Sequence, residues 1–345
     1  MKRIKSYNMS VDIIRILAVF FVVLSHTTDR FVLYTPLKGS ISWNIIYYFN
    51  TLSHVAVPLF IMLSGYLLLR KEKLKNIKLF YKRRFSRILL PFIFWVIIYS
   101  GNDINWDRAR VTIHYIQQRL WNGDVWHLYF LIIILELYLV TPILMRLIEK
   151  LSKKKKAILF WSLLAFSIFC SLLNIYNIDF KRNSLTMFIP YIGIFYAGAY
   201  LRTVKIQKKL IPILLAIYFF LPVITNRIGN GVLGAFIVLN YSPTLLPMTL
   251  SLFLVLKNIH QFFRKRLLSG YIPKVIAFIA PTAFGIYLVH ALVLDRVFSY
   301  FHLYPWQIHT PLVFYAPLPA ILTFLISFLI IVAIRKIPYG KYVVG

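Results

Sequence analysis

Two ionisable side chains stand out in the first long apolar segment of this chain. Arg15 and His26 lie eleven residues apart in a stretch that is otherwise mostly apolar. A membrane helix normally excludes such groups, so an ionisable residue there faces a protein interior or a water-filled cavity and marks function. Eleven helical residues return to within about 20° of the starting direction and rise roughly 16 Å. The spacing therefore predicts that both side chains lie on one helix face, at different depths, and that this face lines a passage.

Three histidines are candidates for acid–base chemistry. Because an imidazole titrates near neutral pH, His26 could take a proton from a hydroxyl while that hydroxyl attacks an acyl carbon. His127 and His290 lie in later apolar segments, at a similar predicted depth in the outer half of the membrane. They could equally be packing residues that hydrogen-bond between helices. A metal site is not expected, because no two of these histidines have i, i+4 spacing and nearby carboxylates are few.

The composition is that of a polytopic membrane protein. The chain is 60% hydrophobic and 14% charged, and many apolar runs reach the roughly 20 residues that a helix needs to cross a bilayer. We predict an all-α fold with ten transmembrane helices in a single domain, residues 1–345, without an attached soluble domain. The predicted spans are 11–27, 43–69, 88–99, 126–148, 157–176, 185–201, 210–224, 233–256, 272–294 and 312–334.

Two details of this span assignment can be checked separately. The third span is short as delimited, so we expect it to begin within 79–87 and to contain Pro91, which should kink it. The stretch 103–123 is too polar to cross a bilayer. We expect it to form an outer loop with a short interfacial helix.

Positive charge supports the span count, since Lys and Arg collect in cytoplasmic loops. With the N-terminus in the cytoplasm, 30 of the 40 Lys and Arg residues fall in cytoplasmic segments, 9 fall in outer loops, and Arg15 completes the set. The excess alternates loop by loop. We therefore expect both termini in the cytoplasm and His26 near the outer end of its helix.

The formal net charge of +30 consequently belongs mostly to one membrane face. Topology and attraction to anionic lipid headgroups explain most of it. Nucleic acid is not an expected partner, because the cations are spread over short loops and no soluble domain presents a basic surface. A polyanionic cytosolic cofactor is compatible with this charge.

Several stretches of the chain, taken in their order along the sequence, resemble the acyltransferase 3 family of integral membrane acyltransferases. Asp12 to His26 resembles the family's first helix, which has an arginine, ten intervening residues and a histidine. Four further stretches resemble the family in the same order: 57–66, 84–87, 126–130 with Glu136 and Tyr138, and 284–290. The chain length and the segment 53–66 look most like the short enterobacterial common antigen O-acetyltransferase type. Each stretch is weak alone, but the ordered set is specific.

The resemblance implies transfer of an acyl group, usually acetyl from acetyl-coenzyme A, to a carbohydrate hydroxyl on the far side of the membrane. It implies that His26 is the catalytic base, and that Arg15, Arg84 and Arg87 are essential or bind the donor. We therefore expect a multi-pass protein of the bacterial cytoplasmic (inner) membrane. Its expected partners are acyl-coenzyme A, membrane lipids and a saccharide or glycolipid acceptor.

The residues make physical sense of such a donor. The phosphates of coenzyme A must stay at the cytoplasmic face, while the thin pantetheine arm can carry the thioester into the membrane. Arg84 and Arg87 lie three residues apart on one helical face, and a guanidinium fork suits phosphate oxygens. Topology alone could also explain these two cations. Ser64 and Gly65 could leave room for the donor arm, or could permit tight helix packing.

Three other candidates each have two interpretations. Asp12, one turn from Arg15, could orient its guanidinium for the donor or form a purely structural pair. Glu136 is an acid within a span and needs a partner, either Arg15 or a group on another helix. Trp126 could anchor the helix at the membrane interface, or could stack on a sugar on the acceptor or oxyanion side together with His127 and His290.

Two other classes of protein share some of these features. A secondary transporter or a flippase of lipid-linked saccharides would also have intramembrane charges, but the sequence shows no internal repeat of the kind that such proteins use. A channel is disfavoured because rings of repeated polar residues are absent. Release of free thiol from acetyl-coenzyme A in the presence of glycans would separate an enzyme from a transporter.

Overall fold

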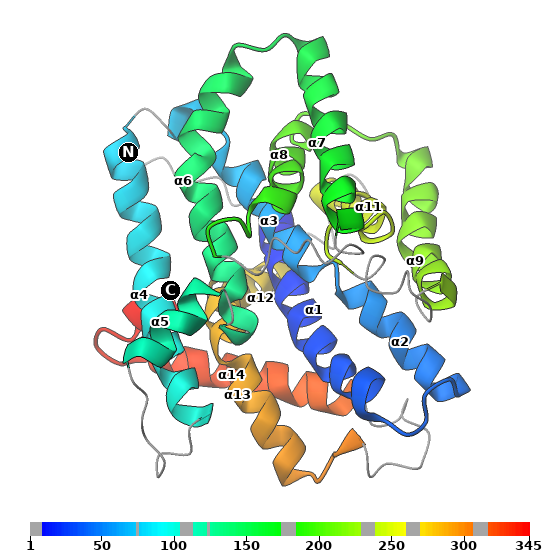
Figure 1. The fold of residues 1–345 in the computed structure, drawn as a ribbon, viewed down its shortest axis with the longest axis vertical. Coiled ribbons are helices and arrows are strands. Elements are labelled where there is room, and N and C mark those ends of the chain that lie inside the picture. Colours follow the sequence, from blue (N-terminus) through cyan, green and yellow to red (C-terminus); the bar gives the residue numbers. More distant parts are fainter. Residues whose placement is uncertain are drawn as a thin grey trace.

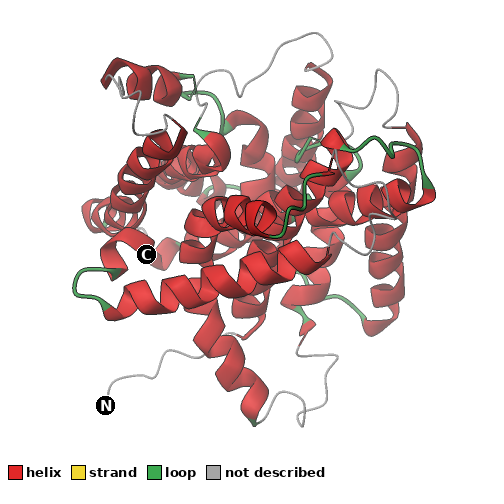
Figure 2. Cartoon of the chain, turned by 90° about the horizontal axis from the view of Figure 1, so that it is seen from below, coloured by secondary structure: helices red, strands yellow, loops and turns green. Residues whose placement is uncertain are grey.

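The computed structural model describes the chain over residues 9–73, 76–103, 113–122, 125–173, 184–228, 239–259, 270–305 and 317–345. Over these ranges the chain is helical and contains no strand, and Figure 2 shows helices joined by short loops. The predicted all-α fold class is therefore confirmed.

The helices follow one another in chain order, as the colours of Figure 1 show. Their bounds are α1 Met9–Tyr34, α2 Ile41–Ser53, α3 Ala56–Leu68, α4 Ile77–Asp103, α5 Ile113–Trp121, α6 Tyr129–Glu149, α7 Lys153–Leu173, α8 Ile192–Leu201, α9 Ile211–Ile228, α11 Leu245–Lys257, α12 Tyr271–Ile279, α13 Ala283–Tyr300, α14 Pro317–Lys336 and α15 Lys341–Val344. Single 3-10 turns lead into α6, α8 and α13, at Trp126–Leu128, Ile189–Tyr191 and Ala280–Thr282.

Eight of the described helical stretches are long and apolar enough to cross a membrane, judged by length and composition. They are Met9–Tyr34, Ile41–Leu68, Ile77–Gly101, Trp126–Glu149, Lys153–Leu173, Lys208–Arg227, Tyr271–Tyr300 and Pro317–Lys336. Two shorter apolar helices, Ile189–Leu201 and Leu245–Lys257, fall at the sixth and eighth predicted spans. The chain is thus a polytopic membrane protein whose ten apolar stretches follow the predicted order.

The boundaries differ from the prediction in places. The third span begins at Ile77, before the expected 79–87, and its helix continues through Pro91 to Asp103. The polar stretch contains the expected short helix, α5. Parts of the predicted spans 157–176, 233–256 and 312–334 lie outside the described residues.

Helix α1 lies in the middle of the bundle (Figure 1) and packs against α2, α3, α13 and α14. The face that carries Arg15 and His26 also carries Val19 and Val22, which are 0% and 3% exposed. Neighbouring helices therefore cover the apolar middle of this face. Its two ionisable side chains lie above and below the covered part.

Close packing of α3 on α8 depends on a pair of glycines. A Cβ atom on Gly65 would lie 1.7 Å from the carbonyl oxygen of Phe195, and one on Gly198 would lie 1.8 Å from the carbonyl oxygen of Met62. Small residues let membrane helices approach backbone to backbone in this way. The structure therefore places Gly65 at a helix contact.

The second span is interrupted in its middle. Helix α2 ends at Ser53 and α3 begins at Ala56, so His54 and Val55 form the junction. Pro58, in the first turn of α3, has no N–H and cannot continue the hydrogen-bond ladder of α2. The ninth span has a similar interruption at Pro281, within the 3-10 turn between α12 and α13. Both interruptions border the cavities described below.

Two cations hold helix ends, Arg202 just after α8 and Lys257 at the end of α11. Arg202 Nη1 donates to the carbonyl oxygens of Tyr66 and Leu69, both at 3.1 Å, at the end of α3. Lys257 Nζ donates to the carbonyl oxygen of Leu201 at 2.7 Å, at the end of α8. The last carbonyls of a helix lack intrahelical partners and form the negative end of its dipole, so a cation there is stabilising. Burial lowers the pKa of the Arg202 guanidinium, and the nearby charge of Arg70 lowers it further.

Candidate active site

A cavity of about 370 Å³ lies between α1, α3, α4, α6 and the start of α13, and we call it the arginine cavity. Its lining includes Arg15, Arg84, Arg87 and Ser64. These residues come from three separate spans. The structure thus brings together four of the five residues that were predicted to contact the donor. The fifth, Gly65, does not line this cavity.

Arg15 is held by its neighbour on α1. Its Nη1 donates to Asp12 Oδ1 at 2.9 Å, and the side chains are 38% and 16% exposed, respectively. A guanidinium has five N–H donors, so this single bond leaves most of the fork available to a ligand. The bond agrees with both predicted roles of Asp12, the orienting and the purely structural one.

Arg84 and Arg87 complete the positive charge of the arginine cavity. Arg84 is partly buried and its Nε has no hydrogen-bond partner, while Arg87 is exposed. No Asp or Glu side chain lines the cavity. Three guanidinium groups, of which Arg15 is paired with Asp12, give the cavity a positive charge that suits phosphate oxygens, which arginine binds through paired, charge-assisted hydrogen bonds.

A second cavity of about 270 Å³ contains the imidazoles, and we call it the histidine cavity. His26 and Asp29 of α1, His54 at the junction of α2 and α3, and His127 before α6 line it. The His26 side chain is 40% exposed, so one side of the ring faces open space. A small polar molecule entering this cavity would therefore meet His26.

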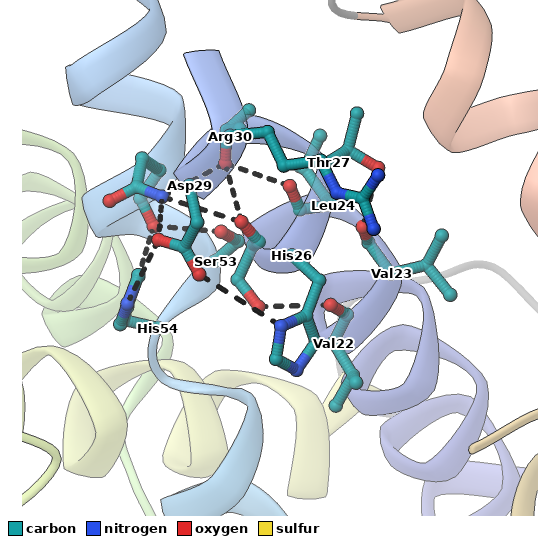
Figure 3. Close-up of polar contacts among 12 residues, drawn as sticks. Val22, Val23, Leu24, His26, Thr27, Asp29, Arg30, Ser53 and His54 are labelled. Carbon is teal, nitrogen blue, oxygen red and sulfur yellow. Dashed lines mark hydrogen bonds and ion pairs between the residues drawn. The ribbon is translucent and has the colours of Figure 1, made fainter. Parts of the chain in front are cut away.

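Asp29 joins two of these histidines (Figure 3). Its Oδ2 lies 4.0 Å from His26 Nδ1, and its Oδ1 lies 3.7 Å from His54 Nε2. The same Oδ1 accepts a hydrogen bond of 2.8 Å from Asn50 Nδ2, which holds the carboxylate in place. His54 Nδ1 in turn lies 2.8 Å from the Asn50 carbonyl oxygen. The result is a carboxylate between two imidazoles.

The sequence analysis missed both Asp29 and His54. A signal for Asp29 was present, because it lies three residues after His26 and such residues share a helix face. For His54 no signal of this kind existed, since it comes from another span. A carboxylate beside Nδ1 favours the tautomer with the hydrogen on that nitrogen and leaves Nε2 as a free base. The pair has the residue types of a general base and its orienting acid, at a separation of 4.0 Å that is longer than a hydrogen bond.

The three predicted histidines lie together. The ring centroids are 5.2 Å apart for His26 and His290, 6.2 Å for His26 and His127, and 4.7 Å for His127 and His290. His290 is completely buried, and its Nδ1 lies 2.6 Å from the carbonyl oxygen of Tyr287, so that nitrogen carries the hydrogen. The Nε2 atoms of His127 and His290 are buried without a hydrogen-bond partner.

The described side chains offer no metal site. Within the described ranges, no group of three or more His, Cys, Asp or Glu side chains could hold a metal ion. A catalytic zinc site needs three protein ligands converging on one point.

Glu136 and Trp126 line neither cavity. Glu136 Oε2 accepts a hydrogen bond of 3.1 Å from the backbone N–H of Phe188. Its partner is therefore a group on another segment of the chain, which was one of the two predicted possibilities, and not Arg15. The guanidinium carbon of Arg119 lies 4.0 Å from the centre of the Trp126 ring. One face of that indole is therefore already occupied by a cation.

The two cavities adjoin. Phe130 of α6 and Tyr287 of α13 line both of them. Arg15 lines the first cavity and His26 lines the second, in the order of their positions along α1. The single passage expected from the spacing of these two residues thus consists, in this structure, of two neighbouring chambers with a shared wall.

Known proteins resemble the chain over most of its length. The model of the acyltransferase 3 family, described as an acyltransferase domain, matches residues 8–334. Among curated proteins, matches come from Staphylococcus aureus strains MSSA476, MW2 and N315, each named probable poly-beta-1,6-N-acetyl-D-glucosamine export protein. Each is 22% identical over 314 residues, which cover 87% of this chain and 86% of the relative. No solved structure matches the chain significantly.

Proposed function

Because the chain belongs to the acyltransferase 3 family, we propose that it is a membrane O-acyltransferase that uses acetyl-coenzyme A. In this proposal it moves the acetyl group from the cytosolic donor to a hydroxyl of a cell-envelope carbohydrate on the extracytoplasmic side. One observation carries the proposal: a cavity with three arginines adjoins a cavity with an imidazole–carboxylate pair along α1. The two cavities match the two ends of the reaction, a polyanionic donor and a hydroxyl to be deprotonated.

The donor binds from the cytoplasm in this mechanism. Arg84 and Arg87 hold phosphate oxygens of coenzyme A, which remain at the membrane surface because charged groups are costly in the hydrocarbon region. The pantetheine arm extends past Ser64 and Arg15 toward the histidine cavity. Asp12 keeps the Arg15 fork in position through the bond between their side chains.

Transfer forms one bond and breaks one. The acceptor hydroxyl oxygen attacks the thioester carbonyl carbon while His26 Nε2 takes the hydroxyl proton. The new C–O ester bond forms, the C–S bond breaks, and the leaving sulfur receives the proton to give the free thiol of coenzyme A. Asp29 holds the Nδ1 side of His26 and stabilises the imidazolium while it carries the proton.

The acceptor side is formed by His127 and His290, with Trp126 nearby. A bare Nε2 atom accepts a hydrogen bond from a sugar hydroxyl, and a protonated one stabilises a developing oxyanion. Among the described residues neither Nε2 atom has a hydrogen-bond partner; His127 lines the histidine cavity, and the buried His290 lies behind it. Glu136 has a supporting role through its bond to the backbone of Phe188.

The finer assignments follow from the resemblance and the relatives. We place the protein in the inner membrane of a bacterium, as a relative of the short enterobacterial common antigen O-acetyltransferases. Its acceptor in the proposal is a saccharide or a glycolipid. The names of the S. aureus relatives, which refer to a poly-N-acetylglucosamine, point to a surface polysaccharide.

Purified protein tests the proposal directly. In detergent or nanodiscs, acetyl-coenzyme A and a panel of envelope glycans should release free thiol only when an acceptor is present, and mass spectrometry should find the ester on that glycan. His26→Ala protein of normal expression and thermal stability should release thiol about 10²- to 10⁴-fold more slowly. Thiol release that is equal with and without His26, or absent with every glycan of the cell of origin, would refute the transferase.

An export function is the second candidate, and the names of the S. aureus relatives favour it. A secondary transporter or flippase would move a lipid-linked saccharide without cleaving a thioester. In sealed proteoliposomes with saccharide inside, an exporter would change the side on which the saccharide is found in the absence of acetyl-coenzyme A. Transfer predicts thiol release and no such movement.

A further inference from the structure

Phe130 and Tyr287 are the side chains that the arginine cavity and the histidine cavity share. They are 7% and 3% exposed, so the rings are enclosed by protein. Their ring centroids lie 5.5 Å apart, at an angle of 72°. An edge-to-face pair of this kind leaves little space between the rings. The two rings therefore lie between the arginine cavity and His26 and obstruct the path from one to the other.

Neighbouring groups hold both rings in place. The Tyr287 hydroxyl donates to the carbonyl oxygen of His127 at 2.5 Å, and its ring lies parallel to that of Phe284. Phe130 packs against Phe60, with ring centroids 5.8 Å apart. Packed side chains change position only at a cost in free energy, so widening the space between the two rings is costly.

We propose that Phe130 and Tyr287 form a constriction that selects short acyl groups and keeps water away from the donor thioester. The proposal rests on the transferase function proposed above. A thioester with a small acyl group needs only a small displacement of the two rings to reach His26, whereas a longer acyl chain needs a larger and more costly one. The constriction thus makes this pair the specificity-determining residues for the acyl donor.

The same opening controls a side reaction. If water reaches the thioester, its oxygen attacks the acyl carbon, the C–S bond breaks, and the products are a free carboxylate, a proton and the coenzyme A thiol. This hydrolysis wastes the donor without an acceptor. Closed active sites suppress such reactions by excluding water. A wider opening should therefore raise both the acceptance of long acyl chains and the hydrolysis.

Phe130→Ala tests the proposal, with Phe130→Leu as the milder variant if the alanine protein does not fold. The assay compares acetyl-, butyryl- and hexanoyl-coenzyme A, and measures thiol release with and without an acceptor glycan. We expect the ratio of hexanoyl to acetyl transfer to rise by about tenfold in Phe130→Ala, because one or more methylene groups in an apolar pocket change rates by this order. Thiol release without acceptor should rise as well.

Ile134→Ala is the matched control. Ile134 lies one turn after Phe130 on α6, is also buried, at 3% exposure, and lines the arginine cavity but not the histidine cavity. Its truncation also enlarges the donor side, but it should leave the acyl-chain preference as in the wild type. An unchanged preference in Phe130→Ala, or an equal shift in both variants, would overturn the constriction while the wild-type acetyl transfer stands. If the wild-type protein transfers no acyl group, the proposed transferase activity is overturned, and the proposed role of the constriction fails with it.

Discussion

Asp29 Oδ2 lies 4.0 Å from Nδ1 of His26, one turn further along α1. The other oxygen of this carboxylate is bonded to Asn50 and faces His54 across the interrupted second span. The relation gives His26 a group that can orient its ring and balance its charge. It also links α1 to the junction of α2 and α3, where the second span departs from a regular helix.

Replacing Asp29 by Asn should leave His26 in place but remove the charge that stabilises its protonated form. We expect the turnover rate to fall about 100-fold, with a small change in the KM for acetyl-coenzyme A, since the loss concerns proton transfer and not donor binding. Steady-state thiol release would measure both constants. Asp295→Asn is a suitable control, because Asp295 pairs with Arg30 at an exposed position. Equal losses in the two variants would contradict the role of Asp29.

His26→Ala should remove the general base. A positioned base contributes about 10²- to 10⁴-fold, so we expect loss of activity within this range and normal insertion into the membrane. The rate of ester formation on the glycan is the measurement. His302→Ala provides the comparison, since His302 is exposed and borders neither cavity. A fully active His26→Ala protein would exclude this imidazole as the base.

Arg84→Gln and Arg87→Gln should weaken the binding of coenzyme A. Each removes charge-assisted hydrogen bonds to phosphate, so we expect the KM for the donor to rise by about tenfold, and coenzyme A to protect less against thermal unfolding. Arg83→Gln is the matched control on α4, because Arg83 is exposed and does not line the arginine cavity. If all three variants behave alike, the cations act through topology and not as a donor site.

Gly65→Ala should destabilise the fold without a specific effect on chemistry. The added Cβ would lie 1.7 Å from the carbonyl oxygen of Phe195, and because that atom is backbone, α3 and α8 must separate. We expect a loss of about 3 kcal/mol, seen as a lower Tm in size-exclusion or fluorescence melting. Ser64→Ala, on the neighbouring residue that lines the arginine cavity, should melt near the wild-type temperature. A stable Gly65→Ala protein would mean that the two helices are not in close contact.

Some contacts of the site could not have been foreseen from spacing. Glu136 had two plausible partners in the sequence, and the bond to the Phe188 N–H depends on how far α6 and the turn before α8 are offset along their axes. Gly65 had two interpretations for the same reason, because the rotation of α3 about its axis decides whether this position faces a cavity or a neighbouring helix. By contrast, Asp29 could have been found by applying the i, i+3 rule to His26.

Hydropathy, the positive charge of alternate loops and the helical repeat are properties of short stretches. The sequence by itself therefore determined the all-α membrane fold, the order of ten apolar stretches and the common face of Arg15 and His26. The cytoplasmic location of both termini stays a prediction. Only the tertiary structure decided that Asp29 meets His54, that three histidines cluster, and that Phe130 and Tyr287 stand between two cavities. These contacts join residues of different spans, and they depend on the depth and rotation at which helices pack, which many side chains set together.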